Sequence, residues 1–505
     1  MGRRIRWVGV IMVVCFGLVI VQLVNIQFVK AHQLASSPNN PREAALKYNN
    51  PRGTIYAAGG TVLAKSVRAT PGQYKYPYHY IREYPDGPLY AGIVGYDSPL
   101  YYGTAGIEEE YDAQLSAHSE GPQNLSQLIF RQATPLTTDD VTLTIQPSLQ
   151  QAAWDALTTL PPGANKDGAV VVLDPATGAV EAMVSNPTFD PNALVNPSVA
   201  AEVFAHGGYV SQDHEGFYPL LPIATGERFA PGSTFKVVTS TAAYNLKPSL
   251  ANFDYPYMAC QSFPDSNKPL CDESGPCGGT MTTMLPASCD PGYGELGVQL
   301  GVPILQEQAE LFGYNSTPGI DLPAVVPSVF PTLPSGSQAL LAYSAIGQYN
   351  VAATALQNAM VAAGIANGGV VMTPHLMSQI RGSQGNLVET YSPKPMPRTA
   401  TPQAATQVTD LMKRVAVDGT AAGVGFPSYL CVAVKTGTAQ TSPTQLETET
   451  WMIGFAPAND PKVAVAVVVP EQTIASDGAE VAGPIMKAVL EAAVPPGSTS
   501  GSCSS

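Results

Sequence analysis

The sequence predicts an α+β fold with a single transmembrane helix at the N-terminus, a small mixed domain, and a larger domain that combines an antiparallel sheet, flanking helices and an all-helical lobe. Three observations predict it. An uncharged apolar stretch opens the chain, strand patterns occur on both sides of a long helical region, and 45% of the 505 residues are apolar while only 13% are charged. This composition supplies a large core and argues against a disordered chain.

The net charge of the chain is −14, with 25 Lys and Arg against 39 Asp and Glu. Proteins that bind nucleic acid usually gather basic side chains on one face. We therefore expect no nucleic-acid partner.

The apolar stretch covers residues 7–29, and a helix of this length crosses a hydrocarbon core of ~30 Å. Three arginines precede it within residues 1–6, and only Lys30 follows it closely. The positive-inside rule therefore predicts a cytoplasmic tail of residues 1–6 and places the rest of the chain outside the cell membrane. A cleaved signal peptide has a shorter apolar segment, of about 7–15 residues, so we expect an uncleaved anchor.

Residues 30–140 are polar, rich in Pro and Tyr, and short of long periodic segments. They predict a small mixed domain with many loops, which we interpret as a pedestal. The pattern changes near residue 140, where Asp140–Ile145 alternates as a strand does and Pro147 fits the first turn of a helix. We therefore place the larger domain at residues 141–495.

Within that domain, residues 169–174 and 179–184 read as two strands joined by a tight turn, which predicts a β-hairpin. Helical patterns dominate from residue 233 to about 375, and strand patterns return near the C-terminus. The expected late elements are the strands Leu430–Val434, Trp451–Phe455 and Val463–Val469, a helix over Pro484–Ala493, and a disordered Gly/Ser-rich tail over 496–505.

The chain contains seven cysteines, and four of them, Cys260, Cys271, Cys277 and Cys289, lie within 30 residues. No paired CxxC motif is present, so we expect no metal site. Outside the membrane disulfides are permitted. We expect one bridge among the first three of these cysteines, with Cys289 and Cys431 reduced.

The first chemical motif is Ala230-Pro-Gly-Ser-Thr-Phe-Lys236. A serine and a lysine three residues apart share one face of a helix, and Pro231 and Gly232 place Ser233 near the helix N-terminus. A serine hydroxyl needs an adjacent base to act as a nucleophile, and a desolvated lysine supplies one. This is the single Ser-x-x-Lys pattern in the chain.

Two further motifs follow. Lys435-Thr436-Gly437-Thr438 comes directly after an expected strand, and its charge and hydroxyls suit a substrate carboxylate, while its glycine permits close backbone approach. Ser288-Cys-Asp290 lies between the other two motifs and says little by itself.

The order Ser-x-x-Lys, Ser-x-Asn-like, Lys-Thr-Gly resembles the penicillin-binding proteins and serine β-lactamases. Outside the site, the chain is similar to the class B penicillin-binding proteins. The matching segments are Pro51–Ile55, Gly106–Leu115, Gly168–Gly178, Gly347-Gln348, Gly419–Ala421 and Trp451–Pro457.

The resemblance implies a D,D-transpeptidase that cross-links peptidoglycan stem peptides, is acylated by β-lactams and needs no cofactor. It assigns Ser233 as nucleophile, Lys236 as its base, Ser288 as proton relay and Lys435 as support for that relay. Asp290, Thr436, Gly437 and Thr438 would contact the substrate. It also implies partners: a multi-pass membrane glycan polymerase and proteins of the division or elongation machinery.

One departure concerns Asp290, where the family usually has Asn. An ionised Asp accepts hydrogen bonds but donates none, and it would hold Lys236 protonated. Either Asp290 is protonated, or it shares a proton with Lys236, or catalysis is weakened. An inactive relative that acts as a scaffold is therefore the alternative. The pedestal is too short for a glycosyltransferase domain, and the absence of a Leu-Asn dipeptide argues against a β-lactamase.

Overall fold

The computed structural model describes residues 2–25, 47–70, 72, 79–98, 103–119, 136–159, 166–196, 199, 218–440, 447–473 and 476–497. The N-terminal helix α1 (Gly2–Val24) is long and apolar enough to cross a membrane. It confirms most of the expected apolar helix, whose last residues lie outside the described part of the chain. This one helix is consistent with a single-pass membrane anchor.

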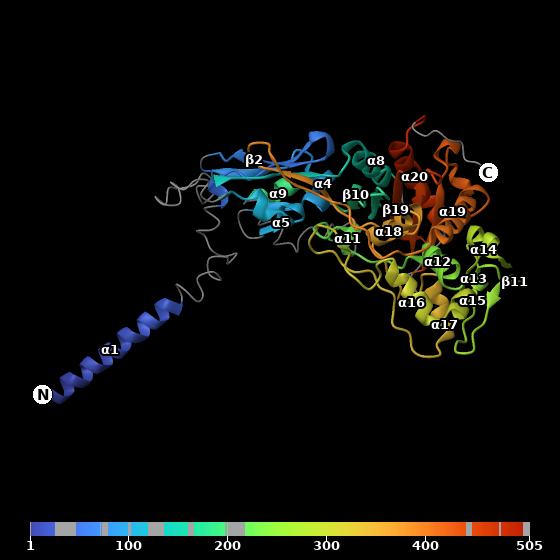
Figure 1. Cartoon of the computed structure of the whole chain (residues 1–505), viewed down its shortest axis with the longest axis horizontal. Helices are drawn as coiled ribbons and strands as arrows, with labels where there is room; N and C mark the ends of the chain where they lie inside the picture. Colours follow the sequence, from blue (N-terminus) through green and yellow to red (C-terminus); the bar gives the residue numbers. More distant parts are fainter. Residues whose placement is uncertain are drawn as a thin grey trace.

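The core of the larger domain is a five-stranded antiparallel sheet in the order β10-β9-β19-β18-β17. Its central strands are buried on both faces because helices cover both. Figure 1 shows this sheet between its helices, with the helical lobe beyond it. The strands are β9 (Gly168–Leu173), β10 (Val180–Asn186), β17 (Ala433–Gln440), β18 (Glu447–Ala456) and β19 (Val463–Thr473).

Helices α8 (Pro147–Thr158) and α20 (Gly478–Ala493) pack together on this sheet, and α18 (Ala355–Ala366) also packs on it. The predicted hairpin is confirmed. Further helices carry the nucleophile segment or pack around it. They are α11 (Ile223–Gly226), η3 (Gly232–Phe235), α12 (Lys236–Leu246), α13 (Pro248–Ala251), α14 (Met281–Ala287), α15 (Asp290–Leu300), α16 (Val302–Leu311), α17 (Gln338–Ala345) and α19 (Pro402–Val417).

Two expectations near the C-terminus are wrong. The segment at 430–434 is not a strand, because residues 428–430 form a 3-10 turn and β17 begins only at Ala433. Lys435 therefore lies inside the strand and not after it. The last helix begins at Gly478 and not at Pro484, because the Asp477 side chain caps it by accepting hydrogen bonds from the N–H groups of Ala479 and Glu480.

The small domain is built on a six-stranded sheet in the order β16-β15-β8-β1-β2-β3. Its first three strands in the chain come before residue 140, but β15 and β16 come from the far end of the helical region. The sheet thus crosses the boundary expected near residue 140, which stays a prediction. The strands are β1 (Ile55–Tyr56), β2 (Val62–Arg68), β3 (Tyr80–Glu83), β8 (Asp140–Leu143), β15 (Met377–Arg381) and β16 (Leu387–Thr390).

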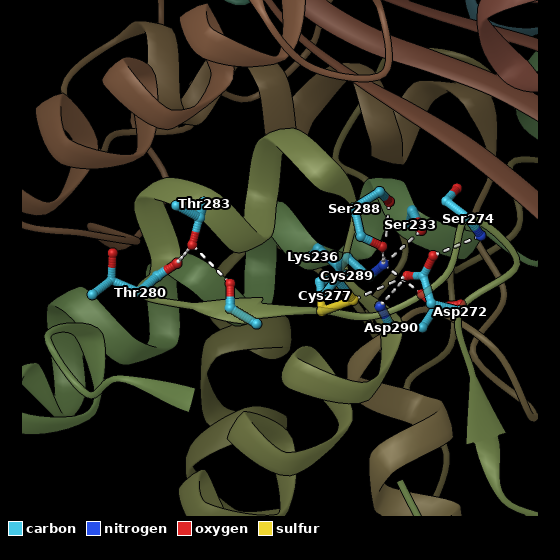
Figure 2. The surroundings of a disulfide bond; sticks show 11 residues. Ser233, Lys236, Asp272, Ser274, Cys277, Thr280, Thr283, Ser288, Cys289 and Asp290 are labelled. Carbon is cyan, nitrogen blue, oxygen red and sulfur yellow. Dashed lines mark hydrogen bonds and ion pairs between the residues drawn. A yellow bond between two sulfur atoms is a disulfide. The ribbon is translucent and has the colours of Figure 1, made fainter. Parts of the chain in front are cut away.

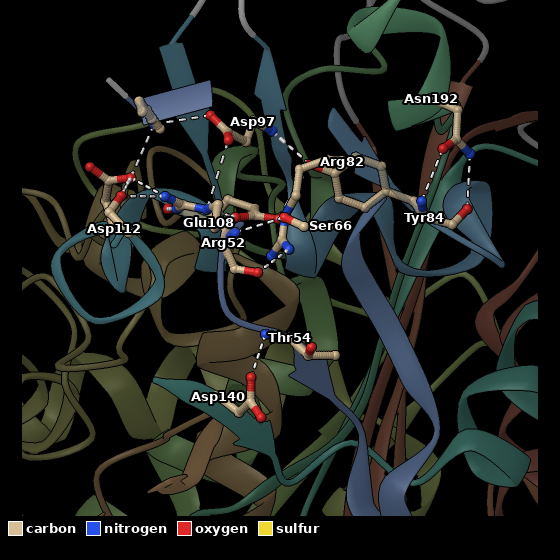
Figure 3. Close-up of polar contacts among 12 residues, drawn as sticks. Arg52, Thr54, Ser66, Arg82, Tyr84, Asp97, Glu108, Asp112, Asp140 and Asn192 are labelled. Carbon is tan, nitrogen blue, oxygen red and sulfur yellow. Dashed lines mark hydrogen bonds and ion pairs between the residues drawn. The ribbon is translucent and has the colours of Figure 1, made fainter. Parts of the chain in front are cut away.

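A buried ionic cluster, shown in Figure 3, holds the small domain together. Arg52 Nε lies 2.6 Å from Glu108 Oε2, and Arg82 Nε lies 2.6 Å from Glu108 Oε1. Arg52 also reaches Asp112, from the short helix that follows Glu108. The next residue, Gly53, packs so close to Asp139 that a Cβ would overlap its carbonyl oxygen. These contacts explain the Arg-Gly and Gly-Ile-Glu patterns of the sequence.

The disulfide prediction is correct in one part and wrong in another. Cys260 and Cys271 face each other on paired strands β12 (Cys260–Gln261) and β13 (Leu270–Cys271) and form a bridge. A second bridge joins Cys277 to Cys289, and Cys431 is also disulfide-bonded. Cys289 and Cys431 are therefore not reduced. The fold brings Cys277, on β14 (Cys277–Gly279), against the start of α15, a pairing that linear spacing does not reveal.

Candidate active site

Ser233 lies in the single turn η3 that leads directly into α12, and Lys236 is the first residue of α12. Lys236 Nζ donates a hydrogen bond to Ser233 Oγ at 2.9 Å. The lysine side chain is fully buried. The expected pairing of nucleophile and base on one helical face is therefore present in the structure.

Close backbone packing fixes the turn that carries Ser233. The Gly232 N–H donates to the carbonyl of Gly347 at 3.0 Å, and a Cβ on Gly347 would stand 2.1 Å from the Gly232 oxygen. Gly347 also has a φ of 75°, a left-handed conformation that glycine adopts without strain. On the other side, Trp451 Nε1 donates to the carbonyl of Ala230 at 3.0 Å.

Ser288 occupies the junction between α14 and α15, where it has a left-handed backbone with φ 57°. This conformation turns its side chain toward both active-site lysines. Ser288 Oγ lies 2.9 Å from Lys435 Nζ and 3.2 Å from Lys236 Nζ. A hydroxyl between two lysine amines is placed to pass a proton.

Asp290 begins α15, and its carboxylate oxygen Oδ1 lies 2.5 Å from Lys236 Nζ. The Asp290 N–H in turn donates to Asp272 Oδ2 at 3.0 Å. Figure 2 shows Asp290 and Ser288 directed at Lys236, with the Cys277–Cys289 disulfide beside them. The residue in which this chain departs from the family pattern is thus a direct partner of the base.

Lys435 points from β17 into the same buried space and is fully covered. Burial, and then the positive charge of Lys236, hold the pKa of Lys435 well below its usual value. The charge of Asp290 acts in the opposite direction but does not compensate. Lys435 Nζ also donates to the carbonyl of Thr436 at 2.8 Å, which fixes its direction.

The other residues of this motif are tied to the enzyme itself. Thr436 Oγ1 lies 2.6 Å from Thr420 Oγ1, and Thr438 Oγ1 accepts from the N–H of Gly478 at 3.1 Å. A Cβ on Gly437 would stand 2.8 Å from the carbonyl oxygen of Pro231. The glycine therefore admits the turn before Ser233, while the close approach of a ligand backbone at this position stays a prediction.

Three residues outside the predicted set contact the site. The Tyr293 ring lies under Lys236, with Nζ 5.5 Å from its centre, and Tyr293 Oη lies 2.7 Å from Ser240 Oγ. Asp272 accepts a hydrogen bond from the N–H of Asp290, and the hydroxyls of Thr420 and Thr436 are hydrogen-bonded to each other. Tyr293 lies three residues after Asp290 on the same helix, so its position near Lys236 could have been predicted from helical spacing. Asp272 lies in a loop, and its position cannot be predicted from spacing.

Asp272, Cys277 and Cys289 bring their ligand atoms within 4.8 Å of one another, as a metal site would require. Both cysteines are in one disulfide, however, and have no thiolate to offer. Within the described part of the chain, this group does not fit a metal ion.

Comparison with known proteins agrees with this geometry. Residues 168–491 match the family described as the penicillin binding protein transpeptidase domain, which covers more than half of the chain. This chain belongs to the penicillin-binding proteins. Residues 52–139 match the penicillin binding protein A dimerisation domain. The two domains together make it a class B penicillin-binding protein, a serine-type D,D-transpeptidase.

Curated relatives support the assignment over the full length. The peptidoglycan D,D-transpeptidase PbpA of Mycolicibacterium smegmatis is 36% identical, with 99% of this chain and 100% of the relative covered. The protein of the same name from Mycobacterium tuberculosis is 35% identical over 98% and 99%. The structure of penicillin-binding protein A from M. tuberculosis as a penicillin G acyl-enzyme has a TM-score of 0.75 at 33% identity, covering 88% of this chain and 99% of that one.

Proposed function

We propose that this penicillin-binding protein cross-links peptidoglycan stem peptides through an acyl-enzyme on Ser233. The observation that carries the proposal is the 2.9 Å contact between Lys236 Nζ and Ser233 Oγ inside a buried cluster that also holds Ser288 and Lys435. The acyl-enzyme structures of similar chains support it.

In the first step Ser233 Oγ attacks the carbonyl between the two terminal D-Ala residues of a donor stem, and its proton passes to the neutral amine of Lys236. The backbone N–H groups of Ser233 and Thr438 stabilise the oxyanion. Gly232 supports this pairing because a Cβ there would stand 2.8 Å from the Thr438 oxygen, so the turn and the strand lie against each other.

In the second step the proton moves from Lys236 to Ser288, and Ser288 gives its own proton to the nitrogen of the departing D-Ala. Lys435 orients Ser288 and, with Thr436 and Thr438, attracts the terminal carboxylate. An amine of a second stem then attacks the ester carbonyl, forms the new amide bond and releases Ser233 with its proton restored. β-Lactams acylate Ser233 as in the first step, but their leaving group stays covalently attached to the acyl group.

Asp290 adds one requirement. Lys236 acts as a base only as a neutral amine, and a carboxylate 2.5 Å away favours the ammonium. We propose that the proton moves onto Asp290 along this contact when substrate arrives. The pair then becomes neutral amine and neutral acid without exchange with bulk water.

We further propose that α1 anchors the protein with residues 1–6 in the cytoplasm and the transpeptidase domain outside. The charge asymmetry around the apolar stretch supports this orientation. The small domain would act as a pedestal that docks partner proteins, such as a multi-pass glycan polymerase and components of the division or elongation machinery.

Labelling of the full-length protein with a fluorescent penicillin, followed by a cross-linking assay with a donor stem and an amine acceptor, tests the proposed activity. We expect both covalent labelling and a cross-linked product. A folded protein that yields neither would instead favour the inactive scaffold, a role for which the comparisons give no support.

A further inference from the structure

A short loop of the helical lobe, residues 272–276, is fixed at both ends by covalent bonds. Cys271, just before it, is bonded to Cys260, and Cys277, just after it, is bonded to Cys289. Two disulfides around five residues leave little freedom to the loop. Because Cys289 is also the residue between Ser288 and Asp290, the loop is fixed relative to the active site.

Asp272 organises the inside of this loop. Its Oδ1 accepts from the N–H of Ser274 at 3.0 Å, and its Oδ2 accepts from the N–H of Asp290 at 3.0 Å, as Figure 2 shows. Both oxygens are thus engaged by the enzyme. The side chain of the next residue, Glu273, is exposed and reaches across to the sheet.

Glu273 meets Gln440, the last residue of β17. Gln440 Nε2 donates to Glu273 Oε1 at 3.1 Å. Gln440 shares one face of its strand with Thr436 and Thr438, because side chains alternate along a strand. The pair therefore joins the helical lobe to the face of β17 on which the substrate is proposed to lie.

The direction of the substrate along β17 follows from the residues at each end. Lys435, Thr436 and Thr438 attract the terminal carboxylate, and the turn that carries Ser233 lies beside Thr438 and Ala439, since Gly232 packs on both. The remainder of the donor stem must leave Ser233 away from the carboxylate. That direction leads to Gln440 and Glu273.

The chemistry of this end favours a cation. Glu273 and its neighbour Asp272 are both acidic, and Asp272 has its oxygens occupied. An exposed hydrogen bond such as that between Gln440 and Glu273 contributes little to stability, so a ligand can replace Gln440 at small cost. We propose that Glu273 binds the side-chain ammonium of the donor stem peptide, and that Gln440 occupies this position until the stem arrives.

This inference rests on the proposed function, since it names a subsite of the same reaction. The test compares three acylating reagents on the full-length protein. The first is a thioester peptide, acyl-L-Lys-D-Ala-thiolactate, with a free lysine ammonium. The second is the same peptide with that amine acetylated, and the third is penicillin G, which has no ammonium.

We expect Glu273→Gln to lower kcat/KM for the ammonium peptide roughly tenfold, about the effect of one hydrogen bond to a charged group. It should change the rates with the acetylated peptide and penicillin G less than twofold. Gln440→Lys supplies an internal ammonium to Glu273 and should produce the same selective loss. Glu389→Gln, on the exposed strand β16, is the matched control and should change none of the three rates.

Equal losses with all three reagents in Glu273→Gln would overturn the inference, because they would indicate a structural role for the loop. Unchanged rates with all three would overturn it as well. A wild-type protein that reacts with none of the reagents would contradict the proposed function itself, so the two failures are distinguishable.

Discussion

The small domain and the active site each contain a buried cluster of charged side chains, but the two clusters are balanced differently. In the small domain, positive and negative groups are equal in number: Arg52, Arg82 and Lys47 face Glu108, Asp97 and Asp112. In the active site, two fully buried lysines lie on either side of Ser288, and the carboxylate of Asp290 is in direct contact with Lys236, whereas Lys435 contacts a hydroxyl and a carbonyl.

The difference separates a structural cluster from a reactive one. Arginine keeps its proton and offers a rigid fork to carboxylates, so the small-domain cluster holds one arrangement. The pKa of a lysine falls when its side chain is buried, as that of Lys435 does here, so such a group can exchange a proton during a reaction. Substitutions in each cluster should therefore have different effects on acylation and on stability.

Lys435→Met removes the amine that contacts Ser288, and we expect acylation by penicillin G to fall by about 10²- to 10⁴-fold, the range typical of groups that assist proton transfer. The fold should persist, because a buried amine is replaced by an apolar chain of similar length. Stopped-flow acylation and urea unfolding measure the two effects. A rate within a factor of three of wild type would contradict the role given to Lys435.

The same variant carries a pH signature. Since the pKa of Lys435 is lowered in the folded state, the unfolded state binds more protons between that lowered value and the usual ~10.4. Wild-type stability should therefore rise relative to Lys435→Met as the pH rises from 6 toward 10. A gap that stays constant over this range would show that Lys435 has an ordinary pKa.

Arg52→Met should lower the stability of the protein and leave its acylation rate unchanged, the reverse of what we expect for Lys435→Met. It leaves Glu108 buried with only Arg82 as a charged partner, and we expect a loss of about 3–5 kcal/mol in the free energy of unfolding. The acylation rate per folded molecule should stay unchanged. If the rate falls while stability is retained, the small-domain cluster acts on catalysis and the contrast fails.

Asp290→Asn changes the charge of the active-site cluster while it keeps the shape. The ammonium form of Lys236 loses its anionic partner, and the asparagine adds a donor for the substrate. We expect acylation near neutral pH to become roughly tenfold faster, as measured by stopped-flow acylation. An unchanged or slower rate would show that the charge of Asp290 does not restrain Lys236.

Sequence patterns predicted which residues form the site better than they predicted the local structure around each residue. Ser233, Lys236, Ser288 and Lys435 belong to short motifs, and the structure brings their side chains together. The pattern did not place Lys435 inside its strand, because the apolar run before it is interrupted by a turn at 428–430. It also did not predict that the missing side chain of Gly437 lets the turn before Ser233 pack against β17.

Long-range pairings were the least predictable part of the fold. The strands β15 and β16 follow the helical region but complete the sheet of the small domain. Asn192 also binds the backbone of Tyr84 through both its side-chain atoms. We therefore expect a fragment that starts near residue 140 to expose the edge of β8 and to be less stable than the whole chain. The sequence pattern alone did not predict this loss of stability.

The most direct test of the account is the mass of the intact protein after treatment with penicillin G. We expect one covalent adduct per wild-type molecule and none in Ser233→Ala, whose backbone and lysine cluster are kept. An adduct that survives in folded Ser233→Ala would contradict the assignment of Ser233 as the nucleophile.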